Sequence, residues 1–134
     1  SRRIFLITGD GELAEGSNWE AALAAAHYGL DNLIIINDKN NLQLAGPTRE
    51  IMNTDPLADK WKAFGMTVTE CQGNDMASVV ATLEGLKQEG KPNVVIANTT
   101  KGAGISFIQG RPEWHHRVPK GEEIALALEE LKDE

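Results

Sequence analysis

The chain has 134 residues, 41% of them hydrophobic, which is enough to form a single hydrophobic core. Its 13 basic and 20 acidic residues give a net charge of −7, which argues against nucleic-acid binding because that function needs a basic surface. The apolar runs are too short to cross a membrane, and the single Cys71 cannot form an internal disulfide. We therefore expect one globular domain in the cytoplasm, with Cys71 as a small buried strand residue rather than a nucleophile.

Short apolar runs alternate with helical segments along the chain. We predict strands at 3–8, 33–38, 66–71 and 93–98, and helices at 17–28, 55–64, 75–88 and 122–131. Ser17 and Glu20 have the spacing of a capping box, and Gly29 is expected to end the first helix. Residues 40–53 and 99–121 are expected to be loops. Because strands that alternate with helices form parallel sheets, the predicted fold class is α/β, a parallel sheet flanked by helices.

Two polar motifs follow the first two predicted strands. Gly9-Asp10-Gly11 comes after the run 4–7, which we interpret as a buried strand, and Asn40-Asn41 comes after the run 33–36. Parallel strands end at the same edge of a sheet, and open α/β sheets bind ligands there. The carboxylate and the amide are therefore expected to meet. Together with tight glycine turns, they suit a hard divalent cation that holds a phosphate.

Charge strengthens this interpretation. A bound phosphate needs a counter-charge on an acidic protein, and a metal held by Asp10 and Asn40 would provide it. The alternative role for Asp10 is purely structural, as an acid that a helix dipole favours at the amino-terminus of the helix.

The motifs resemble the thiamine diphosphate signature, in which Gly-Asp-Gly is followed by Asn-Asn about thirty residues later. Within that superfamily, the residues Gly-Asp-Gly-Glu-Leu-Ala-Glu-Gly at 9–16 and Trp-Glu-Ala at 19–21 look like transketolase. A late block agrees, since Lys101 begins Lys-Gly-Ala-Gly and His115, next to Trp114, follows fourteen residues after it. The resemblance covers essentially the whole chain.

Residue roles follow from this resemblance. A metal, Mg²⁺ with Ca²⁺ tolerated, would bind the Asp10 carboxylate, the Asn40 amide oxygen and the backbone carbonyl of Leu42. Asn41 stands where many transketolases have glycine, and both residue types accept a left-handed backbone. The residues implied to bind the cofactor, thiamine diphosphate, are Gly9, Asp10, Gly11, Asn40, Lys101 and His115.

Three candidates for the chemistry also come from the resemblance. His115 would share protons with the substrate. His116 stays open as the alternative, because families differ in the interval from this histidine to the following proline, here Pro119. In transketolases, an acid at the place of Glu15 joins a proton-sharing network at a subunit boundary. An exposed loop acid before a helix is an equal alternative for Glu15.

The resemblance further implies that the chain is incomplete as an enzyme. Nothing matches the glutamate that activates the aminopyrimidine, so we expect residues 1–134 to be a single partial domain, the carboxyl-terminal part of a diphosphate-binding domain. A pyrimidine-binding domain or subunit would complete a homo- or hetero-oligomer, with the Ala-rich helix 17–28 as an interface. The assembled enzyme would transfer a two-carbon ketol unit between sugar phosphates, and this chain alone would be inactive. The alternatives are a dihydroxyacetone synthase, part of a 2-oxo acid dehydrogenase or a non-catalytic scaffold.

Overall fold

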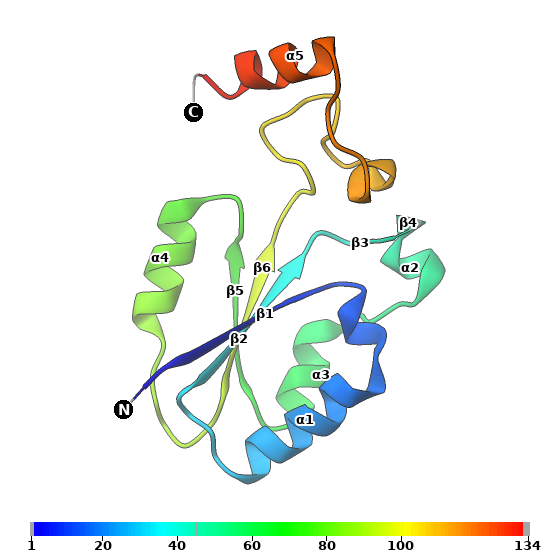
Figure 1. Cartoon of the computed structure of the whole chain (residues 1–134). Coiled ribbons are helices and arrows are strands. Elements are labelled where there is room, and N and C mark those ends of the chain that lie inside the picture. The colour runs from blue at the N-terminus through cyan, green and yellow to red at the C-terminus, as the bar shows by residue number, and fades with distance from the viewer. Residues whose placement is uncertain (1, 45, 133–134) are drawn as a thin grey trace.

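A parallel β-sheet forms the centre of the computed structural model, which describes residues 2–44 and 46–132. The strand order is β1-β2-β6-β5, with all three pairings parallel (Figure 1). These strands are β1 (Ile4–Gly9), β2 (Leu33–Lys39), β5 (Thr67–Gln72) and β6 (Asn93–Asn98). The predicted α/β fold is therefore confirmed, although residues 1, 45, 133 and 134 of the predicted domain lie outside the described residues.

Helices cover both faces of the sheet. Helices α1 (Gly16–His27) and α3 (Leu57–Ala63) lie on one face and α4 (Met76–Gly85) lies on the other (Figure 1). Successive strand residues point to opposite faces, so the strands supply two separate cores. The larger core contains Leu13, Ala22, Ala25, Ile35, Leu57, Trp61, Met66, Val94 and Ile96. The smaller one contains Ile34, Cys71, Val95 and Ala97. Cys71 is therefore the buried strand residue that we predicted.

The segment after β2 is more ordered than the predicted loop. A two-stranded antiparallel sheet is followed by one helical turn, and these elements are β3 (Leu42–Gln43), β4 (Gly46–Pro47) and α2 (Thr48–Ile51). Strands of two residues are too short for an alternating pattern to predict. The remaining elements are the 3-10 helices η1 (Glu12–Ala14) and η2 (Pro112–His115), and the helix α5 (Glu122–Glu130).

Helix ends test the predicted caps. The capping box was wrong, because α1 begins at Gly16 after Glu15, and no side chain caps it. Gly29 does adopt a left-handed backbone with φ of 60° just after the helix, as its predicted role requires. At the start of α4, the Asp75 carboxylate accepts a hydrogen bond of 3.0 Å from the N–H of Ala77.

The burial predicted for the first strand was also wrong. β1 is an edge strand, and its apolar side chains are 56%, 53%, 46% and 69% exposed at Ile4, Phe5, Leu6 and Ile7. Among the described strands only β2 pairs with β1. On the second face of the sheet, α4 lies beside β5, at the edge opposite β1, and does not cover β1 (Figure 1). This leaves an apolar strip along one side of the molecule.

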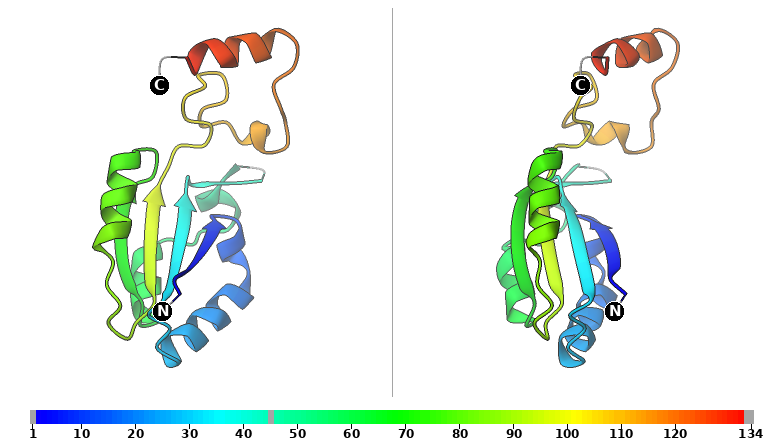
Figure 2. Two further views of the ribbon diagram at one scale, coloured as in Figure 1. Left: turned by 60° about the vertical axis from the view of Figure 1, so that its left-hand side comes forward. Right: turned by 90° about the vertical axis from the view of Figure 1, so that its left-hand side faces the viewer.

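The last part of the chain extends away from the sheet. Residues 99–132 continue beyond the carboxyl ends of the strands and carry α5 (Figure 2). The apolar residues Ile124 and Leu128 of this helix, and Leu131 directly after it, are largely exposed, and Ala127 is the residue that the helix buries. In the described parts of the chain, no helix has the length and apolar character needed to span a membrane.

Candidate functional site

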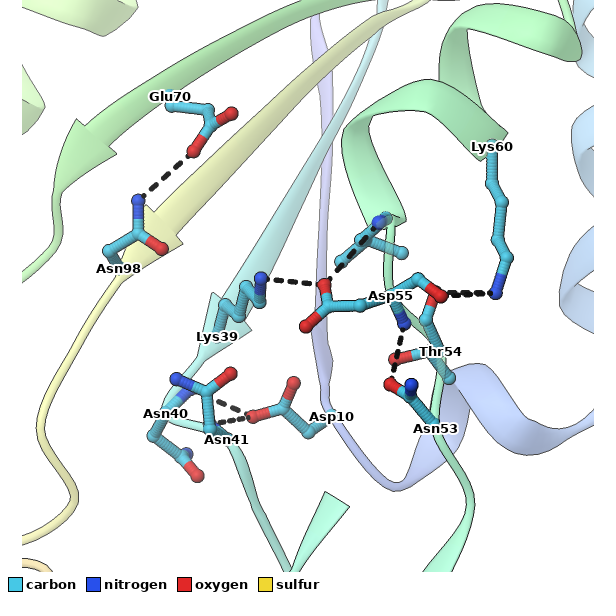
Figure 3. A network of polar contacts seen from close by, with 11 residues as sticks. Asp10, Lys39, Asn40, Asn41, Asn53, Thr54, Asp55, Lys60, Glu70 and Asn98 are labelled. Carbon is cyan, nitrogen blue, oxygen red and sulfur yellow. Dashed lines mark hydrogen bonds and ion pairs between the residues drawn. The ribbon is translucent and has the colours of Figure 1, made fainter. Parts of the chain in front are cut away.

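Asp10 and Asn40 meet at the carboxyl ends of β1 and β2. Parallel pairing places Gly9 beside Asp38, so the residues that follow each strand emerge together. One oxygen of the buried Asp10 carboxylate, Oδ2, accepts hydrogen bonds from two backbone N–H groups, at 2.8 Å from Asn40 and 2.6 Å from Asn41 (Figure 3). The carboxylate thereby fixes the turn that follows β2.

Asn41 has the backbone conformation that this turn requires. Its φ is 61°, in the left-handed region, which asparagine tolerates better than most residues. The turn directs the two successive N–H groups of Asn40 and Asn41 towards the same oxygen.

Burial makes Asp10 an unusual carboxyl group. Removal of water raises its pKa above the ordinary 3.8, while the hydrogen bonds from Asn41 and Asn40 lower it. The negative charge of Asp38 raises the pKa further, and the positive charge of Lys39 lowers it. A bound cation would offset the net cost of keeping this carboxylate ionised.

A cavity of about 580 Å³ opens beside this turn. Its volume is typical of small-molecule sites. The lining residues are Gly9, Asp10, Gly11, Glu12, Glu15, Asp38, Asn40, Leu42, Gln43, Leu44, Lys101 and His115. The structure thus brings together every site residue proposed from the sequence except His116, which is not among the lining residues.

The far wall of the cavity comes from the loop after β6. Lys101 and His115 approach each other, with 3.4 Å between Nζ and Nδ1. The buried Trp114 anchors this wall, because its ring packs against Phe107 and beneath the Arg117 guanidinium. Removal of water lowers the pKa of His115 below 6.5, and the positive charges of Lys101 and His116 lower it further. A neutral imidazole at neutral pH is able to accept a proton.

Two acidic residues in the lining were missed from the sequence. Glu12 accepts a hydrogen bond of 2.7 Å from the Gly9 N–H through Oε2, which closes the Gly-Asp-Gly turn. Asp38 accepts a hydrogen bond from the Thr99 hydroxyl. A signal existed for Asp38, because residues two apart in a strand share a face and Asn40 follows it at that spacing.

The oxygen atoms near Asp10 suit a hard cation. Within residues 2–44 and 46–132, no group of three His, Cys, Asp or Glu side chains could hold a metal, so amide and carbonyl oxygens would have to contribute. The hydrogen bonds that the described residues donate to the Asp10 carboxylate all end at Oδ2, which leaves Oδ1 for a cation. Leu42 pairs with Pro47, which has no N–H to donate to the Leu42 carbonyl. A carboxylate, an amide and a carbonyl oxygen fit Mg²⁺ or Ca²⁺.

Fold and site together define an α/β ligand-binding domain whose pocket lies at the carboxyl ends of parallel strands. Comparison with known families narrows this class. Residues 1–132 match the family described as transketolase, thiamine diphosphate binding domain. The chain belongs to this transketolase family, as its sequence motifs predicted.

Individual relatives agree with this assignment. The chain is 75% identical over 133 residues to an apulose-4-phosphate transketolase subunit of Actinobacillus succinogenes, covering 99% of this chain and 48% of that protein. It is 41% identical over 132 residues to a 6-deoxy-6-sulfo-D-fructose transketolase subunit of a Clostridium species, covering 98% of this chain and 48% of that protein. The chain therefore spans about half the length of these relatives.

A solved structure has the same fold. Transketolase from Campylobacter jejuni superimposes with a TM-score of 0.89 at 32% sequence identity, over 96% of this chain and 20% of that one. The arrangement of strands and helices described above is therefore that of a segment of a transketolase.

Proposed function

We propose that this chain is the diphosphate- and metal-binding part of a thiamine diphosphate-dependent transketolase. In this proposal, residues 1–134 form the carboxyl-terminal part of the diphosphate-binding domain, and a pyrimidine-binding domain or subunit completes the active site. The enzyme would transfer a two-carbon ketol unit between sugar phosphates and would be inactive without that partner. Its cation is Mg²⁺, with Ca²⁺ as a substitute.

One observation carries the proposal, namely the position of the Asp10 carboxylate in the cavity. One carboxylate oxygen is engaged with the turn at Asn40 and Asn41, and the cavity continues from there to Lys101 and His115. Oxygen donors for a cation thus stand at one end of the cavity. At the other end, an ammonium and an imidazole could meet a phosphate-bearing ligand and its substrate.

The residues of this chain would have separate tasks. Asp10, Asn40 and the Leu42 carbonyl would hold the cation, and Gly11 lacks a Cβ, so that a diphosphate could approach its backbone closely. Thiamine diphosphate supplies the carbanion chemistry when bound. His115 would exchange a proton with the sugar substrate, and Lys101 would place a positive charge beside it. Glu15 lines the same cavity and is a candidate for proton sharing with a neighbouring protomer.

The relatives suggest a substrate and a partner. Two of them, at 75% and 40% identity, are named as subunits of an apulose-4-phosphate transketolase. We therefore propose apulose 4-phosphate as the first ketose phosphate to test, in a hetero-oligomer with a second kind of chain. A further relative, at 41% identity, is named for 6-deoxy-6-sulfo-D-fructose, which makes that sugar the natural competitor in the assay.

The deciding experiment measures cofactor binding in the assembled protein. We expect Mg²⁺-dependent binding of thiamine diphosphate by calorimetry, lost when EDTA removes the metal. Asp10→Ala should weaken it by roughly a hundredfold or more, since it removes a metal ligand and the acceptor that fixes the turn. Asp59→Ala is the matched control, because Asp59 is an exposed acid on α3. Equal cofactor affinity in Asp10→Ala and the wild type, with and without EDTA, would refute the metal-dependent site.

A further inference from the structure

An ion pair lies next to the turn that carries the candidate metal ligand Asn40. Lys39 is the last residue of β2 and precedes the turn that Asp10 fixes. Its side chain is only 20% exposed, and its Nζ lies 2.7 Å from Oδ1 of Asp55, in the segment before α3 (Figure 3). None of the tasks assigned above to the site uses this pair.

The segment that carries Asp55 is held by several hydrogen bonds, one of which reaches its carboxylate. The N–H of Asp55 donates to the Asn53 side chain at 3.0 Å, and the N–H of Leu57 donates to Oδ1 of Asp55 at 3.4 Å. The Lys60 ammonium binds the backbone carbonyls of Thr54 at 2.7 Å and Asp55 at 3.3 Å (Figure 3). The backbone at Asp55 is therefore well held, whereas the Lys39 charge sits at the end of a four-carbon stem that could direct it elsewhere.

The Lys39 ammonium is close enough to matter to Asp10. Lys39 directly precedes Asn40, whose N–H donates to the Asp10 carboxylate, so β2 carries the ammonium to the turn that this carboxylate fixes. An ammonium without an acidic partner at this position would be attracted to the other carboxylates at this edge of the sheet, Asp10 among them. If the Lys39 ammonium paired with Asp10, it would neutralise the negative charge that binds the cation.

We propose that Asp55 is a positioning residue for the metal site, holding the Lys39 ammonium on the α3 side of the sheet and leaving the Asp10 carboxylate to a divalent cation. This inference rests on the proposed function, because it concerns the same cation. It predicts an asymmetry that a simple structural tie between β2 and α3 would not produce. Loss of Asp55 frees a competitor for Asp10, whereas loss of Lys39 removes that competitor.

The test is a double-mutant cycle on the full-length protein in its assembled form. Binding of Mn²⁺ in the presence of thiamine diphosphate is followed by the electron paramagnetic resonance signal of free Mn²⁺. We expect Asp55→Asn to weaken Mn²⁺ binding about tenfold, the lower end for residues that support a metal ligand. Lys39→Met should bind Mn²⁺ at least as well as the wild type, and the double variant should return to wild-type affinity. Lys62→Met, which breaks an exposed ion pair on α3, is the control and should change nothing.

The outcomes separate the two levels of the proposal. A wild-type protein that binds no Mn²⁺ with the cofactor would refute the proposed function and this inference together. If the wild type binds but Asp55→Asn is unchanged, only the inference fails. It also fails if Lys39→Met alone loses tenfold in affinity, because the pair would then act as a structural tie. Melting temperatures provide a second measurement. Both single variants and the double variant lack the ion pair, so loss of a structural tie would lower the melting temperature of all three. Only competition between Lys39 and the cation predicts that the double variant recovers its affinity for Mn²⁺.

Discussion

The cavity has a first wall at Asp10 and a second wall at Lys101 and His115, and the two are built in different ways. The wall at Asp10 continues into the core: beneath it, Asn37 is 1% exposed and donates a hydrogen bond of 2.5 Å to the hydroxyl of the buried Thr8. The opposite wall is a segment that projects beyond the sheet (Figure 2), where His115 is exposed and touches Lys101 at 3.4 Å.

This difference separates two kinds of positioning. The sheet itself holds Asp10 and Asn40, because parallel strands carry them to the same edge. Local turns hold the second wall: the N–H of Gly110 donates to the Lys101 carbonyl at 2.8 Å, and Gly102 has a φ of 68° where a Cβ would lie 2.5 Å from the Ile108 side chain. Substitution of buried side chains beneath the first wall should therefore change stability, whereas substitution of the exposed His115 in the second wall should change chemistry with little effect on stability.

The largest expected effect tests the second wall. In the proposed assembled enzyme, His115→Ala should lower kcat/KM for ketol transfer by on the order of 10²-fold or more, the usual contribution of a proton-transfer group. Its melting temperature should stay near that of the wild type, because the exposed ring contributes little to the core. Steady-state kinetics and thermal unfolding of the same preparation measure both quantities.

His116→Ala is the matched control for that experiment. The two rings lie with centroids 4.5 Å apart, but only His115 lines the cavity. We expect a much smaller loss for His116→Ala. If it proves the more damaging substitution, the interval to Pro119 identifies the active histidine and the interval from Lys101 does not. If neither matters, the second wall has no part in catalysis.

The first wall was more accessible to sequence reasoning than the second. Apolar runs marked the central strands, and the predicted 93–98 agrees with Asn93–Asn98. Because Asp10 and Asn40 directly follow two such runs, their meeting followed from the geometry of a parallel sheet. Lys101 and His115 lie in a long loop without periodicity, so only the resemblance to a family associated them with the site.

The errors also have physical causes. The burial of β1 depends on what packs beyond the sheet edge, and the apolar residues of the strand itself do not encode that. Ser17 and Glu20 fit a capping box, but they fit equally well inside a helix that begins one residue earlier. The Lys39–Asp55 pair was missed because its partners are sixteen residues apart, in segments that only the folded sheet brings together.

An intermediate effect is expected in the first wall. Thr8→Val removes the hydroxyl that accepts the Asn37 hydrogen bond and leaves a buried donor without its partner. This should lower the free energy of unfolding by about 1–3 kcal/mol. Denaturant unfolding measures it, with Thr67→Val as the control because Thr67 is an exposed strand residue. Equal unfolding midpoints for Thr8→Val and the wild type would show that the core does not hold this wall as the structure implies.

The smallest effect is a change in the titration of His115. Its pKa lies below 6.5 because of partial removal of water first, and then because of the positive charges of Lys101 and His116. A neighbouring positive charge disfavours protonation of imidazole, so Lys101→Met should raise the pKa of His115.

The protonated form would then persist to higher pH, and the acid limb of the kcat/KM profile should move in the same direction. Nuclear magnetic resonance titration of the histidine rings measures the shift, with Lys120→Met as the control for an exposed lysine in the same segment. An unchanged or lowered pKa would mean that the two side chains are not held together in solution. Its own turns would then not be enough to hold the second wall in this shape.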